Sequence, residues 1–312
     1  MRRHARPLLA SISLVTLAAC QSEPDIARPM TTPDAASEAW LAGVNLPAYL
    51  DCAREQGATL LQAHRAGDRA GAAENSLRAI QASLTDGAVF AEIDVAQTED
   101  GVLVLMHDDT LDRTTTGAGE LDDITYTDLS GIELVDLDGA PTGEPIPTLD
   151  AVLAYLDGRG IAQVDLKDIS FEQVASALEA ADAVDRSIVI TYSMEDALAL
   201  HDRLPGVMMS VGMRSLDDLE TLRTEGVDLS RVTAWLGLGS GRPDRDAELA
   251  RLGVETSYGD FRAEREGRID YRRMADNGAE IISVDDVPAA AAALGAGGKA
   301  AALLQACPAA RT

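Results

Sequence analysis

Short apolar runs alternate along the chain with longer segments whose apolar residues recur at helical spacing. The runs are rich in branched residues and have the length of buried β-strands. Nine such runs are evident, at residues 60–64, 90–95, 102–107, 162–167, 187–193, 207–213, 232–239, 254–259 and 280–286. A strand followed by a helix, repeated many times, predicts a parallel sheet covered by helices.

Two of the runs lie too close together for a helical crossover. The segment between them, Thr98–Gly101, ends in the turn dipeptide Asp-Gly and predicts a β-hairpin. Removing the returning strand leaves eight strand–helix units, the count of a (β/α)8 TIM barrel, which is an α/β fold. An open doubly wound sheet is the alternative, although no glycine-rich nucleotide loop follows the first strand. We therefore predict a barrel with a hairpin after its second strand.

One segment, residues 111–147, breaks this alternation. It is rich in Thr, Gly and Asp and contains only a short helical phrase, "TYTDLSGIEL". We expect it to be a small insertion over the C-terminal face of the barrel.

The first nineteen residues have the features of an export signal. Three arginines among the first six residues precede an apolar core that is too short to span a bilayer. The sequence Leu-Ala-Ala-Cys that ends at Cys20 resembles the lipobox of bacterial lipoproteins, in which the cysteine is lipidated. An ordinary secretory signal is the alternative. Gln21 resembles the outer-membrane sorting pattern, so we expect a lipid anchor there, on the periplasmic side.

We expect residues 20–50 to form a flexible tether and entry segment. The first part of this segment is polar and rich in proline, and its apolar residues do not recur at a regular spacing. Residues 51–312 are enough for one large domain with a substantial core. Cys52 and Cys307 lie at the two ends of this domain. Export permits disulfides and the ends of a closed barrel meet, so a bridge between them is one expectation. Two isolated buried thiols are the other.

The formal net charge of -26 argues against a nucleic-acid partner, because little basic surface is available to displace counterions. The same charge repels anionic ligands at long range. A substrate that carries phosphate therefore needs local cations, including a metal ion, to make its site attractive.

Acidic and basic residues gather at the ends of the predicted strands. Glu92 and Asp94 project from the same face of a strand, and the hairpin places His107 opposite them, within about one residue of register. Two neighbouring carboxylates are oxygen ligands suited to Mg²⁺ or Ca²⁺. An isolated pair of carboxylates also occurs on solvated strand faces. The residues at the ends of the other strands therefore decide between a metal site and a solvated face.

Other strands end in the same way: His64 and Arg65 close the first, Asp165 and Lys167 a later one, and Asp285 and Asp286 the last. Charged residues that close parallel strands lie at the C-terminal face, where barrel enzymes hold their catalytic groups. Two histidines can act as general base and general acid, while a cation and two basic side chains neutralise phosphoryl oxygens. No serine or cysteine stands in a nucleophile motif, which favours direct attack at phosphorus.

Five motifs lie at the ends of the predicted strands and in the loops that follow them. They are His64–Gly67 with Glu74–Ser76, Glu92–Asp94 with Thr98–Gly101, His107–Thr115, Pro147–Leu149 and the closing "GAEIISVDDVP". The third, H-D-x-x-L-x-R-T-T, is complete and specific. By these motifs the chain resembles, from about Leu60 to Pro288, the glycerophosphodiester phosphodiesterase family, a branch of the phospholipase C-like phosphodiesterases.

The resemblance implies metal-dependent hydrolysis of glycerophosphodiesters to glycerol 3-phosphate and an alcohol. It implies that His64 and His107 are the acid–base pair, and that Arg65 and Lys167 contact the phosphate. The metal ligands implied for one divalent cation, Mg²⁺ or Ca²⁺, are Glu92, Asp94 and Asp165. The expected partner is a small-molecule substrate, with the membrane reached only through the lipid anchor.

Three departures from the family pattern bear on substrate choice. Ala66 replaces a glycine, Asp165 replaces a glutamate, and only Trp235 remains of the family's W-T-x-N strand. If residue 66 needs a positive φ, the loop must rearrange, with Gly67 as the residue that could take it. Two alternatives stay open: a phospholipase D-like enzyme that forms a cyclic phosphate, and a non-catalytic envelope lipoprotein that binds metal or phosphate.

Overall fold

The protein is described by a computed structural model that covers residues 39–296, 299–307 and 310. The predicted signal peptide (1–19), the lipidation site Cys20 and the tether as far as residue 38 lie outside the described residues. The folded unit begins before residue 51, where the sequence placed its start. Leu41 and Leu46 are already buried in it.

Eight parallel strands form a closed barrel. In order around the barrel they are β1 (Leu60–Ala63), β2 (Ala88–Gln97), β4 (Ile161–Leu166), β5 (Ser187–Thr191), β6 (Met208–Gly212), β7 (Val232–Leu238), β8 (Glu255–Gly259) and β9 (Ile281–Val284). Strand β1 pairs with both β2 and β9, which closes the ring. The predicted (β/α)8 barrel is therefore confirmed, and the open sheet is excluded.

The ninth predicted strand, β3 (Leu103–Leu105), runs antiparallel to β2, as the Asp-Gly turn indicated. Val95 lies opposite Leu105, and the Met106 amide donates to the Asp94 carbonyl at 3.0 Å. The next residue, His107, therefore lies opposite the stretch 92–94, and the predicted register is confirmed.

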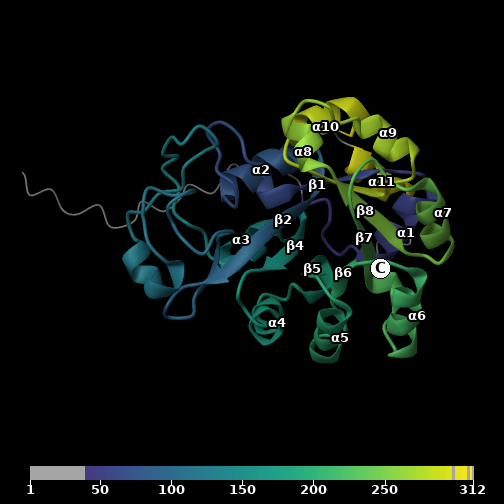
Figure 1. The fold of residues 1–312 in the computed structure, drawn as a ribbon, viewed down its shortest axis with the longest axis horizontal. Helices are drawn as coiled ribbons and strands as arrows, with labels where there is room; N and C mark the ends of the chain where they lie inside the picture. The colour runs from purple at the N-terminus through teal and green to yellow at the C-terminus, as the bar shows by residue number, and fades with distance from the viewer. Residues whose placement is uncertain (1–38, 297–298, 308–309, 311–312) are drawn as a thin grey trace, which may run out of the picture. The chain divides into compact units, whose positions relative to one another are not determined.

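Helices surround the strands, with α4, α5 and α6 on one side and α8, α9 and α10 on another (Figure 1). Several begin at a serine or threonine whose hydroxyl accepts the amide three residues on, such as Ser76 and Thr148. The helices are α1 (Leu46–Glu55), α2 (Leu77–Asp86), α3 (Leu149–Leu156), α4 (Phe171–Ala180), α5 (Met194–Arg203), α6 (Leu216–Thr224), α7 (Pro243–Arg251), α8 (Phe261–Arg265), α9 (Tyr271–Asp276), α10 (Val287–Leu294) and α11 (Lys299–Ala306). No helix among the described residues is long and apolar enough to cross a bilayer.

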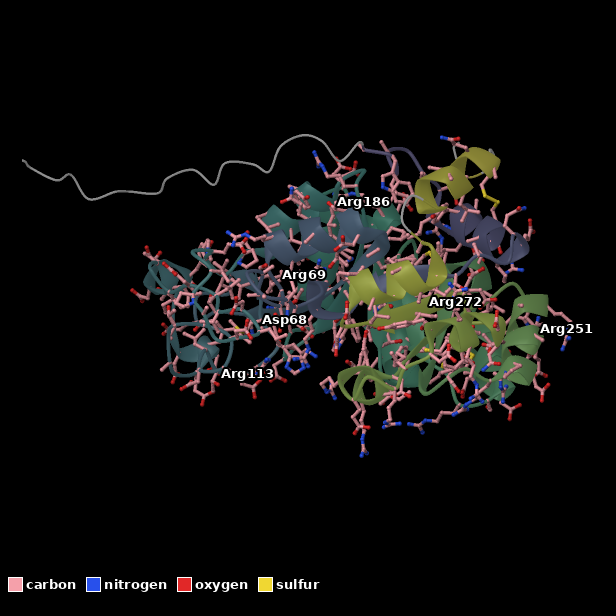
Figure 2. All side chains as sticks on the ribbon, turned by 90° about the horizontal axis from the view of Figure 1, so that it is seen from above. Asp68, Arg69, Arg113, Arg186, Arg251 and Arg272 are labelled. Carbon is pink, nitrogen blue, oxygen red and sulfur yellow. A yellow bond between two sulfur atoms is a disulfide. The ribbon has the colours of Figure 1, made fainter. Side chains whose placement is uncertain are left out.

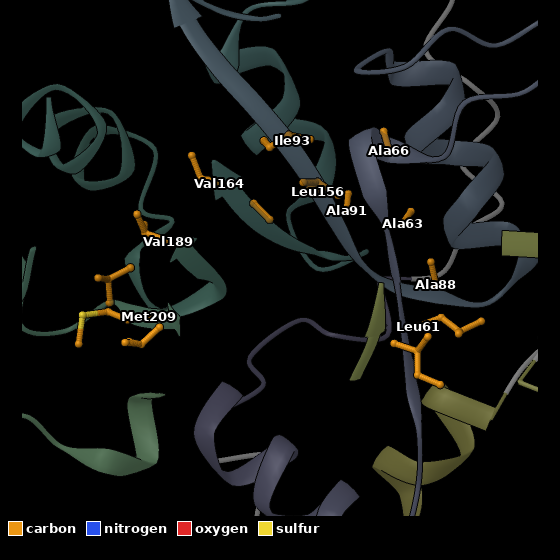
Figure 3. Close-up of a cluster of buried hydrophobic side chains, with 14 of the residues drawn as sticks. Leu61, Ala63, Ala66, Ala88, Ala91, Ile93, Leu156, Val164, Val189 and Met209 are labelled. Atoms are coloured by element: carbon orange, nitrogen blue, oxygen red, sulfur yellow. The ribbon is translucent and has the colours of Figure 1, made fainter. Parts of the chain in front are cut away.

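Alternation along the strands separates two kinds of interior. One set of residues packs outward against the helices, as Ile93, Val164 and Met209 do (Figure 3). The inward set changes character along the barrel. At the N-terminal end it is apolar and is covered by Tyr49 and Leu50 of α1. Toward the C-terminal end it is polar, so the barrel opens there onto groups that can do chemistry.

The insertion has a small core of its own, built from the leucines at 111, 121, 129 and 134 together with Met106 and Ile146. It is tied to the loop after β1, where Asp136 accepts the Gly71 amide at 2.7 Å, and to the start of α2, where Glu144 accepts the Arg78 amide at 3.2 Å. Its residues Arg113 and Leu137 line a cavity that also contains His64, so the insertion forms a wall at the C-terminal face.

The two ends of the described chain meet beneath the barrel. Cys52 of α1 and Cys307, just after α11, form a disulfide with a Cα–Cα distance of 6.0 Å and a sequence separation of 255 residues. The bridge encloses the whole barrel in one covalent loop, which restricts the unfolded chain.

The Cys52→Ala/Cys307→Ala double variant should lower the free energy of unfolding by about 2–5 kcal/mol, because its unfolded chain is no longer cross-linked. Denaturant unfolding with and without a reductant measures this. Reductant should destabilise the wild type by a similar amount and leave the double variant unchanged. Equal stability of all four samples would contradict a structural role for the bridge.

Candidate active site

Three buried carboxylates meet at the C-terminal end of two adjacent strands. Asp94 of β2 lies beside Asp165 of β4 in the sheet register, and Glu92 lies one inward position below. One ligand oxygen from each residue lies within 4.8 Å of the others. Asp165 Oδ1 is buried without a hydrogen-bond partner among the described residues. Burial, followed by the Asp94 charge, raises the pKa of Glu92 well above its usual value. This crowded oxygen set fits a hard divalent cation.

Asn75 holds one of these carboxylates from the loop before α2. Its amide nitrogen donates to Asp94 Oδ2 at 2.7 Å, and its amide oxygen accepts the Asp94 backbone N–H at 3.0 Å. The neighbouring Ser76 is the N-cap of α2, whereas Asn75 orients Asp94. This role could not be read from the chain, because the two residues are nineteen positions apart.

The loop after β1 reaches Glu92 through its backbone. Three consecutive residues, Arg65, Ala66 and Gly67, have positive φ angles of 49°, 68° and 84°. The expected rearrangement around Ala66 does not occur, since the alanine itself adopts the left-handed conformation. Its carbonyl is held by the Ser83 hydroxyl at 2.7 Å. The resulting turn directs the Arg65 amide onto Glu92 Oε2 at 2.6 Å, so the strain serves to orient a candidate ligand.

The two cations predicted to contact phosphate lie against the carboxylates. Lys167 Nζ lies 2.7 Å from Asp165 Oδ2 and 3.1 Å from Asp94 Oδ1. Burial alone would lower the pKa of Lys167, but these carboxylates outweigh it and raise the pKa. The Arg65 guanidinium is 3.4 Å from Glu74 and 3.9 Å from Asp94. Both positive charges therefore border the carboxylate cluster.

Each of the two predicted histidines has a carboxylate on Nδ1. His64 Nδ1 lies 2.7 Å from Asp285 Oδ1, and His107 Nδ1 lies 2.7 Å from Asp108 Oδ1. The His64 ring also stacks on Phe261, with ring centroids 4.0 Å apart. A carboxylate on Nδ1 fixes the ring and leaves Nε2 to exchange a proton, which suits an acid–base pair.

His107 is joined to the cluster by a chain of ion pairs. Arg113 donates to Asp108 and, at 2.8 Å each, to both oxygens of Glu74. Glu74 in turn pairs with Arg65. The hydrogen bond from Arg113 holds the pKa of Asp108 far below its usual value. Arg113 therefore pins the insertion to the site.

Tyr192 was missed by the sequence argument. It follows β5 and donates its hydroxyl to Asp165 Oδ2 at 2.6 Å. Desolvation of its hydroxyl, followed by this bond, raises the pKa of Tyr192 well above its usual value, while the residue as a whole stays exposed. Its place near the end of the predicted strand 187–193 was the signal available, since the charged site residues lie at equivalent places in other strands.

Two cavities meet at His64. One, of about 560 Å³, extends over the barrel mouth and is lined by Glu92, Asp165, Tyr192 and Trp235 among others. The other, of about 730 Å³, runs between the insertion and α8 and includes Arg65, Glu74 and Asp285. Trp235, the residue that remains of the family's W-T-x-N strand, thus lines the first cavity.

Residues 64–218 match the sequence model of the glycerophosphoryl diester phosphodiesterase family. The chain belongs to this family. The match begins at the first candidate catalytic histidine and ends in α6, so it covers the site residues named above except Trp235, Phe261 and Asp285.

Known members of the glycerophosphoryl diester phosphodiesterase family resemble the chain over different lengths. Glycerophosphodiester phosphodiesterase 1 from Homo sapiens is 29% identical over 187 residues, which are 59% of this chain and 53% of that protein. The chain thus spans about half the length of this curated relative.

Solved structures resemble most of the barrel. A glycerophosphoryl diester phosphodiesterase from Parabacteroides distasonis has a TM-score of 0.71 and 26% identity, over 76% of this chain and 86% of that one. A phosphodiesterase from Oleispira antarctica, solved with the product sn-glycerol-3-phosphate, has a TM-score of 0.58 and 18% identity, over 78% and 99% of the two chains. The second likeness shows the fold alone.

The Asp68→Asn variant should be more stable than the wild type at pH 7.5 but not at pH 4. Burial and the Glu74 and Asp136 charges raise the pKa of Asp68 to about 6. The folded state therefore holds this proton more tightly than the unfolded chain, whose aspartates have a pKa of about 3.9, and stability falls as pH rises between these values.

Thermal unfolding of the two proteins at both pH values tests this, with a gain of about 2 °C expected for the variant at pH 7.5. The matched control is Asp138→Asn, at an exposed aspartate of the insertion, whose effect should not depend on pH. A pH-independent difference at Asp68 would contradict the argument.

Proposed function

We propose that the protein hydrolyses glycerophosphodiesters to glycerol 3-phosphate and an alcohol. The observation that carries the proposal is the cluster of Glu92, Asp94 and Asp165 beside two histidines that each have an aspartate on Nδ1. Family membership supports the reaction class, and the named relatives support the substrate class.

The carboxylate cluster would hold one divalent cation, Mg²⁺ or Ca²⁺, which supplies Lewis-acid polarisation of the phosphoryl oxygens. Lys167 and Arg65 border the carboxylate cluster at Asp94, and both side chains would offset the negative charge of a bound phosphate. The net charge of -26 repels an anionic substrate at long range, but salt screens this repulsion. The attraction between the phosphate and these two cations acts at short range and is screened less.

His64 and His107 would share the proton transfers. One takes the proton from water as its oxygen attacks phosphorus, and the other gives a proton to the leaving alcohol oxygen as the P–O bond breaks. Asp285 and Asp108 keep both rings oriented, with Nε2 directed away from the carboxylate. No protein nucleophile is required, so no covalent enzyme intermediate forms.

Two other functions use parts of the same site. A hydroxyl within the substrate could replace water, so that a cyclic phosphate is the product. The phosphorus NMR spectrum of the product distinguishes this case from hydrolysis. A binding lipoprotein would retain ligand without turnover, but such a protein needs no acid–base pair, and both histidine–aspartate pairs are formed.

We also propose that the protein is exported and lipid-anchored to the outer membrane, facing the periplasm. The Leu-Ala-Ala-Cys sequence that ends at Cys20 and Gln21 supports the anchor and its destination. A disulfide between Cys52 and Cys307 is in keeping with an oxidising compartment. Labelling with radioactive palmitate, lost in Cys20→Ser, would test the anchor.

The full chain should release glycerol 3-phosphate from sn-glycero-3-phosphocholine when Mg²⁺ or Ca²⁺ is present. Turnover should stop with EDTA and should fall by about 10²–10⁴ in His107→Ala, because one proton transfer loses its catalyst. Coupled oxidation of the released glycerol 3-phosphate measures the rate.

His201→Ala provides the matched control, since His201 lies in α5 and belongs to no part of the site. It should keep wild-type activity. A folded, metal-loaded wild type without turnover on a panel of phosphodiesters would overturn the proposal in favour of the binding protein.

Mg²⁺ or Ca²⁺ at about a hundred times its Kd should raise the thermal midpoint by about 5 °C, because a ligand that binds only the folded state stabilises it. Glu92→Gln should abolish the rise, while Glu225→Gln, at the exposed end of α6, should keep it. Differential scanning calorimetry reads this out independently of activity. An unchanged rise in Glu92→Gln would place the cation elsewhere.

A further inference from the structure

The cavity of about 560 Å³ has two sides of opposite charge. The side formed by β2 and β4 contributes the candidate metal ligands Glu92 and Asp165. The opposite side, formed by the loops after β6 and β7, contributes Arg214 and Arg242. Two strands, β5 and β6, separate β4 from β7, and three separate β2 from β7, so the arginines lie across the barrel mouth from the carboxylates.

Both arginines carry their charge without an ion pair. Among the described residues, no carboxylate lies within 4.0 Å of either guanidinium, although the chain has 52 acidic residues for 26 basic ones. Other site arginines are paired: Arg65 with Glu74, and Arg113 with Asp108 and Glu74. The two exposed guanidinium groups are therefore available to a ligand.

The same local device places both arginines. The Arg214 amide donates to Asp218 at 2.7 Å, and the Arg242 amide donates to Asp246 at 3.2 Å. In each case this aspartate lies in the first turn of the following helix. Asp218 also accepts the Ser215 amide at 2.9 Å, and Asp246 also accepts the Tyr258 hydroxyl at 2.7 Å. The carboxylates thus fix the loop backbones, while both arginine side chains remain at the rim of the cavity.

Between the two charged sides the cavity wall is uncharged. It contains Tyr192, Met213, Trp235 and Phe261, with no acidic residue on the arginine side. A volume of about 560 Å³ lies within the range of small-molecule sites. A phosphodiester at the carboxylates can therefore extend one of its halves along this wall toward the arginines.

We propose that Arg214 and Arg242 bind a second anionic group, on the alcohol half of the substrate. The inference rests on the proposed function and narrows its substrate class: the preferred glycerophosphodiesters carry a phosphate on the alcohol. The glycerol half is neutral and gains nothing from a guanidinium, whereas a phosphate accepts its planar, charge-assisted hydrogen bonds.

The test compares two substrates that differ by one phosphate, sn-glycero-3-phosphoglycerol and the same compound phosphorylated on its terminal hydroxyl. At low ionic strength the phosphorylated substrate should have about five- to tenfold higher kcat/KM, because its KM is lower. Added salt should reduce this difference. Arg214→Ala/Arg242→Ala should remove this preference and change kcat/KM for the other substrate less than about twofold. Equal kcat/KM in the wild type, or a preference that survives in the double variant, would overturn the proposal.

The control double variant is Arg251→Ala/Arg272→Ala. Both arginines are exposed and are labelled in Figure 2. Neither is among the residues that line the cavity. The control variant should keep the preference for the phosphorylated substrate. If it loses this preference, the preference is due to the total charge of the protein and not to Arg214 and Arg242. A third substrate, in which the second phosphate is esterified with another glycerol, separates a terminal phosphate from an internal link of a phosphodiester chain.

Binding of propane-1,3-diol bisphosphate, measured by calorimetry, separates the inference from the proposed function. Tighter binding to the wild type than to Arg214→Ala/Arg242→Ala, without turnover of any substrate, would retain the anion site and refute the proposed function. Turnover without any difference between the two substrates would retain the proposed function and refute the anion site.

Discussion

Mutual repulsion among three buried carboxylates is the constraint on which the site depends. Glu92, Asp94 and Asp165 are each less than 10% exposed, and water can screen little of their charge. The structure opposes the repulsion locally, with the Lys167 ammonium between two of them and the Arg65 amide on the third. The arrangement is complementary to a cation and is poorly stable without positive charge nearby.

The rest of the barrel offsets the cost of this polar interior. The N-terminal end of the barrel is filled by apolar side chains and covered by Tyr49 and Leu50. Burial of these side chains stabilises the fold without the cost of removing polar groups from water. The disulfide between Cys52 and Cys307 holds this covered end. Stability and chemistry therefore occupy opposite ends of the same strands, as is general for barrel enzymes.

The site residues found from the sequence share one feature: each lies in or directly after a strand with a strong apolar pattern. His64, Asp165 and Lys167 could be placed together because parallel strands end at one face. Asn75 and Glu74 could not, since they lie in an irregular loop whose partners are far along the chain. Arg214 and Arg242 follow strands that were predicted. Their proposed role in anion binding rests on the lack of a carboxylate partner, and ion pairing can be seen only in the folded chain.

The sequence by itself determined the strand count, the hairpin and the face on which the acidic groups gather, because strand periodicity and turn chemistry are local. Only the tertiary structure decided that Ala66 keeps the left-handed turn, that Asn75 holds Asp94 and that Arg113 pins the insertion. These depend on contacts between segments far apart in the chain. The distance between two side chains is set by how the barrel closes, and closure is a property of all eight strands together.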